Sequence, residues 1–250
     1  MKCARALLAL FLLGSAPATG VETDIKLDHA PIDPHDNASL QRGARVFVNY
    51  CLNCHTAGYM RYNRLQDIGL TEQQIRDNLI FTEAKVGDLM KTAMDAKDAK
   101  EWFGAPPPDL TVIVRSRSSH AGPGSDWLYT YLRTFYRDAS RPTGWNNLVY
   151  PNVGMPHALW QLQGDQVVKE AQAQGPGYMK TVQRLALDKP GSLKPLEYDQ
   201  LVADLVNYMT YMSEPARHDR ETLGLYALIV ISILIALAYA LKKEYWKDVH

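Results

Sequence analysis

The sequence predicts a mainly α-helical domain with loop insertions, followed by one C-terminal transmembrane helix. Apolar residues recur at helical spacing in several segments, whereas the alternation typical of strands is scarce. Residues 223–241 carry no charged side chain and, at about 1.5 Å of rise per residue, make a helix about 28 Å long, which matches the hydrocarbon thickness of a bilayer. The hydrophobic content of 46% is enough for one core, and the formal net charge of +0 gives no indication of a nucleic-acid partner.

The N-terminus has the three parts of a secretory signal peptide. Lys2 and Arg5 precede an apolar run at 6–13, and the small residues at 15–18 contain an A-x-A-like cleavage site. Because the apolar run is short for a membrane span, we expect cleavage rather than an uncleaved anchor. The sequence therefore divides into a signal peptide (1–20), an exported domain (21–220), a transmembrane anchor (221–243) and a cytoplasmic tail (244–250).

Residues 51–55 read Cys-Leu-Asn-Cys-His, the C-x-x-C-H pattern of covalent c-type haem attachment. Residues three apart share one side of a helical turn, so Cys51 and Cys54 can both reach one porphyrin edge, and His55 can ligate the iron as the proximal ligand. A redox dithiol would need a βαβ setting, and a zinc site would need two further ligands at matching spacing. Neither is visible in the sequence, so the motif predicts one haem.

Helical spacing and capping signals predict the order of the helices between the motif and the anchor. Gly43 and Phe47 precede the motif on one helical face, and Leu205 and Tyr208 lie on an apolar stripe in the last helix of the domain. We expect the two helices to cross at Gly43, a pairing that resembles the c-type cytochrome fold of class I. Little strand content is expected. The predicted helices cover 38–50, 71–81 (with a Thr71–Gln74 capping box), 88–102, 109 to before Gly122, 126–137 and 195–212, and 142–156 is predicted to be a loop.

The sixth iron ligand decides whether the haem carries electrons or binds a small molecule. A methionine thioether favours Fe(II), raises the potential and blocks exogenous ligands. Met155 stands out because it lies in an irregular loop between Pro151 and Pro156, whereas methionines at helical spacing are usually core residues. From position alone the alternatives stay open: Met60, Met90, Met94, Met179, Met209 and Met212, with His120, His157 and His218 as competing histidines.

Four motifs in this order resemble the cytochrome c1 family, over almost the whole mature chain. They are Arg42-Gly43 through Cys51-x-x-Cys54-His55, Pro107-Pro108-Asp109-Leu110, Gly154 to Leu159 (Gly-Met-Pro-His-Ala-Leu), and Ser213 to Asp219 running into the anchor. The resemblance implies that Met155 is the distal ligand. It also implies that Arg117, with Arg115 as the alternative, pairs with a haem propionate, and that a carbonyl of the Pro108 region packs by the ring and accepts the His55 Nδ1–H. Residues 118–124 are longer than in better-known members and Trp127 replaces an expected Tyr, which leaves the choice of arginine open.

The resemblance also implies a function: a haem c that takes one electron at a time from a Rieske iron–sulfur protein and passes it to a soluble or membrane-bound cytochrome c. Its further partners would be cytochrome b and the lipid bilayer, and it would lie in the inner membrane of a bacterium with the haem domain on the periplasmic side. Two alternatives remain: a membrane-anchored cytochrome subunit of a terminal oxidase or periplasmic dehydrogenase, and a haem protein with an open sixth site.

Overall fold

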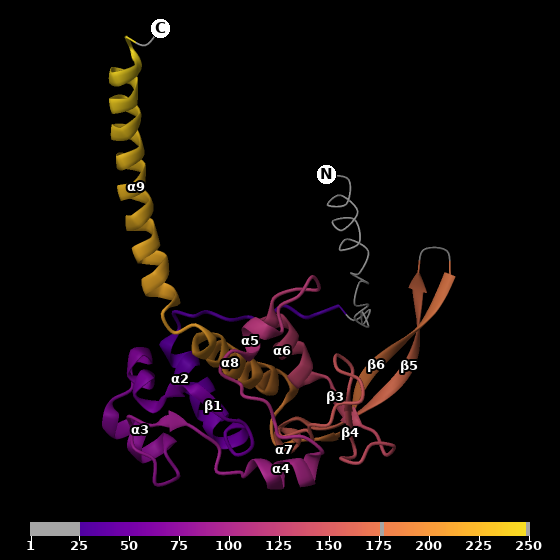
Figure 1. Ribbon diagram of the computed structural model, residues 1–250. Helices are drawn as coiled ribbons and strands as arrows, with labels where there is room; N and C mark the ends of the chain where they lie inside the picture. The colour runs from indigo at the N-terminus through magenta and orange to yellow at the C-terminus, as the bar shows by residue number, and fades with distance from the viewer. Residues whose placement is uncertain (1–25, 176–177, 249–250) are drawn as a thin grey trace, which may run out of the picture.

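The computed structural model describes residues 26–175 and 178–248, so the predicted signal peptide lies outside the described residues. The chain forms a helical domain from which a long helix, α9, and a β-hairpin project (Figure 1). The elements are α2 (Asn37–Val46), the π-helix η1 (Phe47–Cys51), β1 (Ala57–Arg61), the 3-10 helix η2 (Tyr62–Ile68), α3 (Glu72–Leu79), β2 (Leu89–Met90), α4 (Ala96–Phe103), α5 (Ile113–Ser116), α6 (Gly124–Arg133), β3 (Phe135–Arg137), β4 (Trp145–Asn147), α7 (Trp160–Gln163), β5 (Gly164–Gly175), β6 (Tyr178–Pro190), α8 (Pro195–Ser213) and α9 (Arg217–Trp246).

The predicted crossing of the first and last helices of the domain is confirmed. A Cβ atom placed on Gly43 of α2 would lie 2.0 Å from the backbone oxygen of Asp204 and 2.7 Å from the Cβ of Tyr208, both in α8. Only a glycine allows the two backbones this close. Phe47 then packs on Tyr208 with 5.5 Å between ring centroids, and Leu205 is fully buried beside them. The crossing fixes the position of the helix that leads into the C-x-x-C-H motif.

A buried carboxylate beside the crossing holds the two helices in register. Asp204 accepts hydrogen bonds from Arg42 Nε at 2.6 Å, Arg42 Nη2 at 3.0 Å and Ser39 Oγ at 2.7 Å. Asn207, one turn along α8, donates to Ser39 Oγ and to the Asp33 backbone oxygen. A buried carboxylate is tolerable because its oxygens are paired with a guanidinium and a hydroxyl.

Several predicted helix boundaries are wrong. The predicted helix at 88–102 is only α4 at 96–103, because Leu89 and Met90 pair with β1 and the side chain of Asp95 caps the helix by accepting from Lys97 N–H. The first helix is capped by Asp36, and its last part is a π-helix. The Thr71–Gln74 capping box is confirmed, but its helix ends at Leu79.

The segments on either side of residue 122 also differ from the prediction. The helix expected from residue 109 is the short α5 at 113–116, since the Asp109 carboxylate is engaged by the Thr111 N–H and hydroxyl. The next helix, α6, begins at Gly124 and ends at Arg133 instead of spanning 126–137, because residues 135–137 pair with β4. The chain therefore turns into a small sheet where a further helical turn was expected.

The expectation of little strand content is wrong for residues 164–190. Strands β5 and β6 form a long antiparallel hairpin, with Gly164 opposite Pro190 and Gly175 opposite Tyr178. The sequence there mixes Gln, Ala, Lys and Val without a two-residue period, so the hydrophobic pattern does not predict these strands. The hairpin leaves the domain near β3 and β4 and extends away from it (Figure 1).

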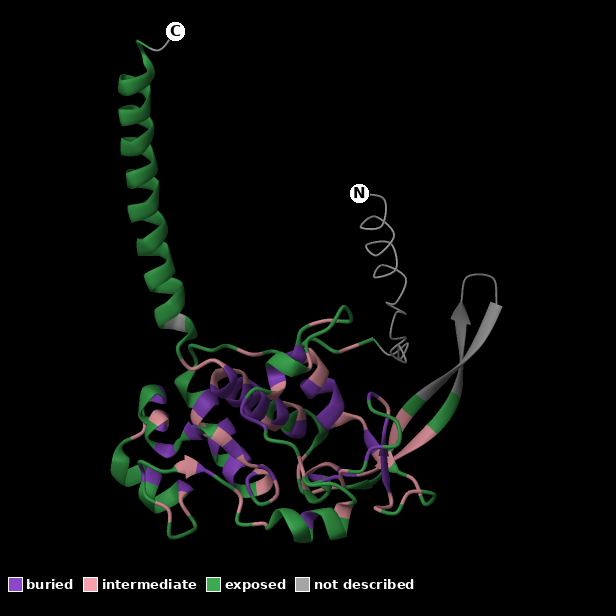
Figure 2. Cartoon of the chain, in the orientation of Figure 1, coloured by how far each residue is buried: buried purple, intermediate pink, exposed green. Residues whose placement is uncertain are grey.

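The C-terminal helix is the expected apolar span. Within Asp219–Trp246 of α9, an 18-residue window has a mean hydropathy of 2.5 and none of that window is buried, while the purple buried residues are concentrated in the domain (Figure 2). By length and composition the helix can cross a membrane. Soluble helices normally cover one apolar face with a core, and this helix has apolar residues on all sides and no such cover.

Candidate haem site

The cysteines and the histidine of the motif come from one turn that continues the π-helix. The backbone N–H of Leu52 donates to the Phe47 oxygen at 3.0 Å, and the N–H groups of Cys54 and His55 donate to the Cys51 oxygen at 3.1 and 2.9 Å. A single π turn at the end of a helix re-aims the residues that follow it and is frequent at functional sites. Here it precedes the residues that carry the chemistry.

The environment of the two thiols argues against a redox dithiol. Cys51 and Cys54 are both free in the structure. Burial raises the pKa of both thiols, that of Cys51 to about 12. Reactive dithiols of the C-x-x-C type have a lowered pKa, because the thiolate is the nucleophile. These thiols lack that activation and are suited to the stable covalent attachment that the motif predicts.

His55 is held by the carbonyl that the resemblance implied. Its Nδ1 lies 2.8 Å from the Pro108 backbone oxygen, and the side chain is buried. A carbonyl can only accept, so Nδ1 carries the proton and the lone pair lies on Nε2, the atom that can ligate a metal. Burial lowers the pKa of His55, which keeps the imidazole neutral. The geometry and the protonation state are those of a metal-ligating histidine.

The Pro107–Leu110 segment is fixed to the strand that follows the motif. Leu110 N–H donates to the Thr56 oxygen at 2.9 Å, and Gly58 N–H donates to the Asp109 carboxylate at 2.7 Å. Prolines cannot donate from their backbone nitrogens, so these neighbouring contacts place the Pro108 carbonyl. The sequence motif at 107–110 therefore holds the imidazole of His55 in place.

Arg117 has an aromatic environment and an unmet hydrogen-bonding atom. Its guanidinium carbon lies 4.6 Å from the ring centroid of Trp127 and 5.5 Å from that of Tyr150. Its Nε is buried and has no hydrogen-bond partner within the described residues. The Arg115 side chain, in contrast, is exposed. A partly buried guanidinium with a buried, unpaired Nε–H fits an anionic group that the described residues do not supply.

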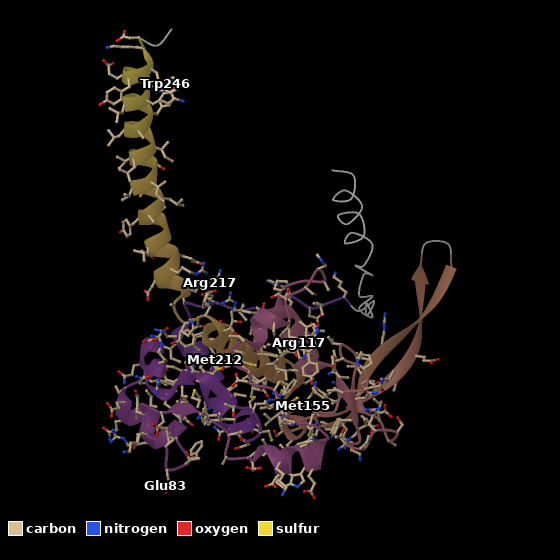
Figure 3. The ribbon with its side chains drawn as sticks, in the orientation of Figure 1. Glu83, Arg117, Met155, Met212, Arg217 and Trp246 are labelled. Atoms are coloured by element: carbon tan, nitrogen blue, oxygen red, sulfur yellow. The ribbon has the colours of Figure 1, made fainter. Side chains whose placement is uncertain are left out.

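Met155 lies in the same part of the domain as Arg117 (Figure 3). Its side chain is partly buried against the core, and its sulfur accepts a hydrogen bond from the Tyr131 hydroxyl at 3.4 Å. Tyr131 stacks on Trp127 with 4.8 Å between centroids and 13° between planes, and burial raises its pKa well above the usual range. Met155, Tyr131, Trp127 and Arg117 thus form one connected group, which we call the distal cluster.

The other candidate ligands have other surroundings. Met60, Met90, Met209 and Met212 are core residues with at most 3% exposure, and Met90 lies on β2 rather than on the helix expected for it. His120 is exposed. The structure does not describe the side chains of Met179 and His218.

His157 is enclosed by aromatic rings. It is 2% exposed, stacks on Phe135 at 4.8 Å and 3°, and meets Trp145 edge to face at 5.0 Å. Burial lowers its pKa to about 4, so the ring is neutral at pH 7. Its position in this stack supports the fold of the loop that carries Met155.

Two buried asparagines that sequence reasoning missed hold the Met155 loop. Asn147 donates from Nδ2 to the Tyr131 oxygen at 2.8 Å and accepts at Oδ1 from the N–H groups of Val149 and Tyr150 at 2.9 and 3.1 Å. Asn146 Oδ1 accepts from Asn152 N–H at 2.8 Å, where Asn152 has a positive φ of 63°. The signal was present: an Asn-Asn pair in a Gly- and Pro-rich segment just before a candidate ligand suits local backbone bonding.

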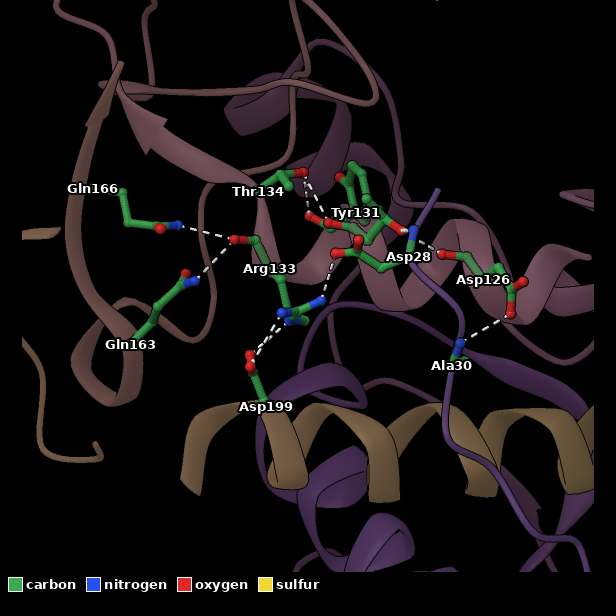
Figure 4. Close-up of polar contacts among 10 residues, drawn as sticks. Asp28, Ala30, Asp126, Tyr131, Arg133, Thr134, Gln163, Gln166 and Asp199 are labelled. Atoms are coloured by element: carbon green, nitrogen blue, oxygen red, sulfur yellow. Dashed lines mark hydrogen bonds and ion pairs between the residues drawn. The ribbon is translucent and has the colours of Figure 1, made fainter. Parts of the chain in front are cut away.

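A second missed network, centred on Arg133, holds α6, the helix that carries Trp127 and Tyr131. Arg133 pairs with Asp28 at 2.7 Å and Asp199 at 2.6 Å, and its backbone oxygen accepts from Gln163 and Gln166 (Figure 4). These contacts connect the N-terminal segment, α6, α7, β5 and α8. The distal cluster therefore stands on a helix that is tied to four other parts of the domain.

Comparison with known proteins agrees with this arrangement. The family model described as the cytochrome C1 family matches residues 28–249. The chain belongs to this family. It is 50% identical over 225 residues to a cytochrome c1 of Allochromatium vinosum, covering 90% of each chain, and 26% identical over 235 residues to that of Rhodospirillum rubrum, covering 86% of this chain and 83% of the relative. It is also 50% identical over 250 residues, and 100% of each chain, to a Nitrosomonas europaea protein described as an ammonia monooxygenase gamma subunit.

Proteins of the cytochrome c1 family carry one covalently attached c-type haem and are membrane-anchored electron-transfer subunits of the cytochrome bc1 complex, and this chain shares that cofactor and that role. The residues present fit the group: two free thiols, an imidazole with its Nδ1 already bonded, a thioether and a buried guanidinium with an unpaired N–H. The alternative of a different membrane-anchored cytochrome is not favoured by these matches.

Proposed function

We propose that, within the bc1 complex, this subunit takes one electron at a time from a Rieske iron–sulfur protein and delivers it to a soluble cytochrome c. The observation that carries the proposal is the bond between His55 Nδ1 and the Pro108 carbonyl, which leaves Nε2 free to ligate a metal, and the distal cluster around Met155 supports it. The bound haem supplies reversible one-electron exchange at its iron.

Each predicted site residue has a role toward the haem. Cys51 and Cys54 would hold the haem through their sulfurs, and His55 and Met155 would ligate its iron. Arg117 would pair with a propionate, and its buried, unpaired Nε favours it over the exposed Arg115. Pro108 orients His55 through its carbonyl and packs by the ring. When the haem is bound, His55 and Met155 would keep water and small ligands away from the metal.

We further propose where the subunit sits. Residues 1–20 would direct export, 21–220 would form the periplasmic domain, 221–243 would cross the inner membrane of a bacterium, and 244–250 would remain in the cytoplasm. The exposed apolar surface of α9 supports the span, and Lys242, Lys243 and Lys247, which follow its apolar stretch, support this orientation. The same helix would pack on cytochrome b within the bilayer.

Purification of the tagged full chain from its native membranes tests the proposed partners. We expect cytochrome b and a Rieske protein to co-purify at fixed ratio, and the c-type haem to be oxidised by added soluble cytochrome c. A stable complex without these two proteins, such as one with oxidase or monooxygenase subunits, would refute the proposal. A complex with monooxygenase subunits would instead agree with the description of the Nitrosomonas relative as an ammonia monooxygenase subunit.

A variant of Met155 tests the ligand assignment. Met155→Ala should open the sixth site, so the reduced protein should bind carbon monoxide and lose the low-spin spectrum, while the wild type should not bind it. Met60→Leu is the matched control, because Met60 is a core methionine with 1% exposure. If Met155→Ala stays low-spin and His157→Phe does not, His157 is the ligand instead.

A further inference from the structure

The hydroxyl of Tyr131 has an unusual acceptor. Among the described residues its one hydrogen bond goes to the Met155 sulfur, 3.4 Å away. A thioether is a weak acceptor, and a buried tyrosine hydroxyl normally bonds to a carbonyl or carboxylate. Tyr198 shows the ordinary arrangement in this same protein, donating to the Leu132 oxygen at 2.8 Å. Tyr208 also donates to a sulfur, that of the core residue Met90, at 3.6 Å. The Tyr131 contact differs in its acceptor, which is the methionine that we propose as the distal ligand.

The Tyr131 ring is held so that its hydroxyl stays on the sulfur. One face stacks on Trp127 at 4.8 Å, and Phe135 contacts the ring edge to face at 5.0 Å. The Tyr131 backbone oxygen is bonded by Asn147, the residue that also holds the Met155 loop. The donor and the loop that bears the acceptor are thus fixed by the same side chain.

From this geometry we propose that Tyr131 is a positioning and tuning residue that raises the reduction potential of the haem by donating its hydroxyl hydrogen to the Met155 sulfur. The inference rests on the proposed role of Met155 as distal ligand. A sulfur that ligates iron through one lone pair keeps another with which it can accept a hydrogen bond. Tyr131 therefore acts on the iron through Met155, without touching it.

The direction of the effect follows from electron density. A donated hydrogen bond withdraws density from the sulfur and makes it a poorer donor. Fe(III) gains more from ligand donation than Fe(II), so the oxidised state loses more and the potential rises. Hydrogen bonds to ligands and burial are the usual protein controls on haem potential. A higher potential suits a subunit that must draw electrons from an iron–sulfur partner.

The test compares Tyr131→Phe with Tyr129→Phe in the full chain purified in its complex. Both variants remove one hydroxyl from a buried tyrosine of α6, but Tyr129 contacts Arg133, with 4.4 Å from the guanidinium carbon to its ring, rather than Met155. We expect Tyr131→Phe to lower the equilibrium constant for one-electron reduction about three- to tenfold, tenfold being 59 mV. The methionine-to-iron charge-transfer band of the oxidised protein should shift but persist. Tyr129→Phe should change neither.

The outcomes separate this inference from the proposed function. If the band persists in Tyr131→Phe and neither the band nor the potential moves relative to Tyr129→Phe, the tuning role is refuted while Met155 remains the ligand. An equal fall of the reduction potential in both variants also refutes the tuning role, because the loss of a hydroxyl from α6 would then act through general packing or solvent entry. If the wild type shows no methionine band, both the inference and the ligand assignment are wrong.

Discussion

Replacement of Asn147 by alanine should both destabilise the domain and loosen the distal ligand. Asn147 is 1% exposed, and its side chain makes three close bonds, to Tyr131 O, Val149 N and Tyr150 N, at 2.8 to 3.1 Å. A net hydrogen bond contributes about 1 kcal/mol, and each group left buried and unpaired costs about 1–3 kcal/mol. The expected loss is therefore about 3–5 kcal/mol of unfolding free energy, a large share of the 5–15 kcal/mol typical of a domain.

The assay has two readouts on the detergent-purified full chain. The urea midpoint of Asn147→Ala should fall, and carbon monoxide should bind to a fraction of the reduced protein, since the loop that presents Met155 has lost its anchor. Asn49→Ala is the control: the side chain of the exposed Asn49 donates to the Arg45 oxygen one turn earlier, and surface changes usually stay within about 0.5 kcal/mol. An unchanged midpoint for Asn147→Ala would refute the energetic reasoning. A lower midpoint without carbon monoxide binding would refute the link between this asparagine and the ligand.

Three further changes follow from the structure. Gly43→Ala should destabilise the domain by about 1–3 kcal/mol or more in urea unfolding, because its Cβ would lie 2.0 Å from the Asp204 oxygen; Gly224→Ala, with open space around it, is the control, and equal effects would contradict the crossing. Burial lowers the pKa of His157 to about 4. Above pH 6.5 the ring is neutral in the folded and the unfolded chain, so its titration does not change the free energy of unfolding. Between about pH 6.5 and 4 only the unfolded chain takes up the proton, which removes up to about 3 kcal/mol of stability. The urea midpoint of His157→Phe should therefore fall less between pH 7 and pH 5 than that of the wild type. An equal fall in both proteins would show that other groups cause the pH dependence. Arg117→Gln should lower the haem potential in a redox titration, since a nearby cation disfavours Fe(III), whereas Arg115→Gln should not; the reverse order would exchange their roles.

The parts of the fold that the sequence predicted are those set by local chemistry or by strong periodicity. The glycine of the helix crossing, the Thr71–Gln74 capping box and the apolar C-terminal helix each follow from residues close together in sequence. The hairpin at 164–190 and the short strand at 89–90 were missed because their partners, not their own side-chain pattern, decide their conformation. In the same way, the capping carboxylate of Asp95 sets where α4 begins.

In the candidate site, too, some residues could be predicted from the sequence and others could not. The motif at 51–55 was predictable from its spacing, and the carbonyl of Pro108 from the resemblance to the cytochrome c1 family. Two other contacts, of Tyr131 with Met155 and of Asn147 with Tyr131, join segments that lie apart in the chain. Sequence periodicity does not predict such contacts. Residues that tune a site are found from the fold, whereas residues that attach its cofactor can be found from the sequence.

A quinol titration of the purified membrane complex, followed by redox-resolved spectra, tests the central claim most directly. The account predicts that b-type and c-type haems are both reduced by quinol in one preparation, and that removal of the Rieske protein abolishes reduction of the c-type haem on Cys51 and Cys54. A c-type haem that is reduced at the same rate without the Rieske protein, or a preparation without b-type haem, would contradict it.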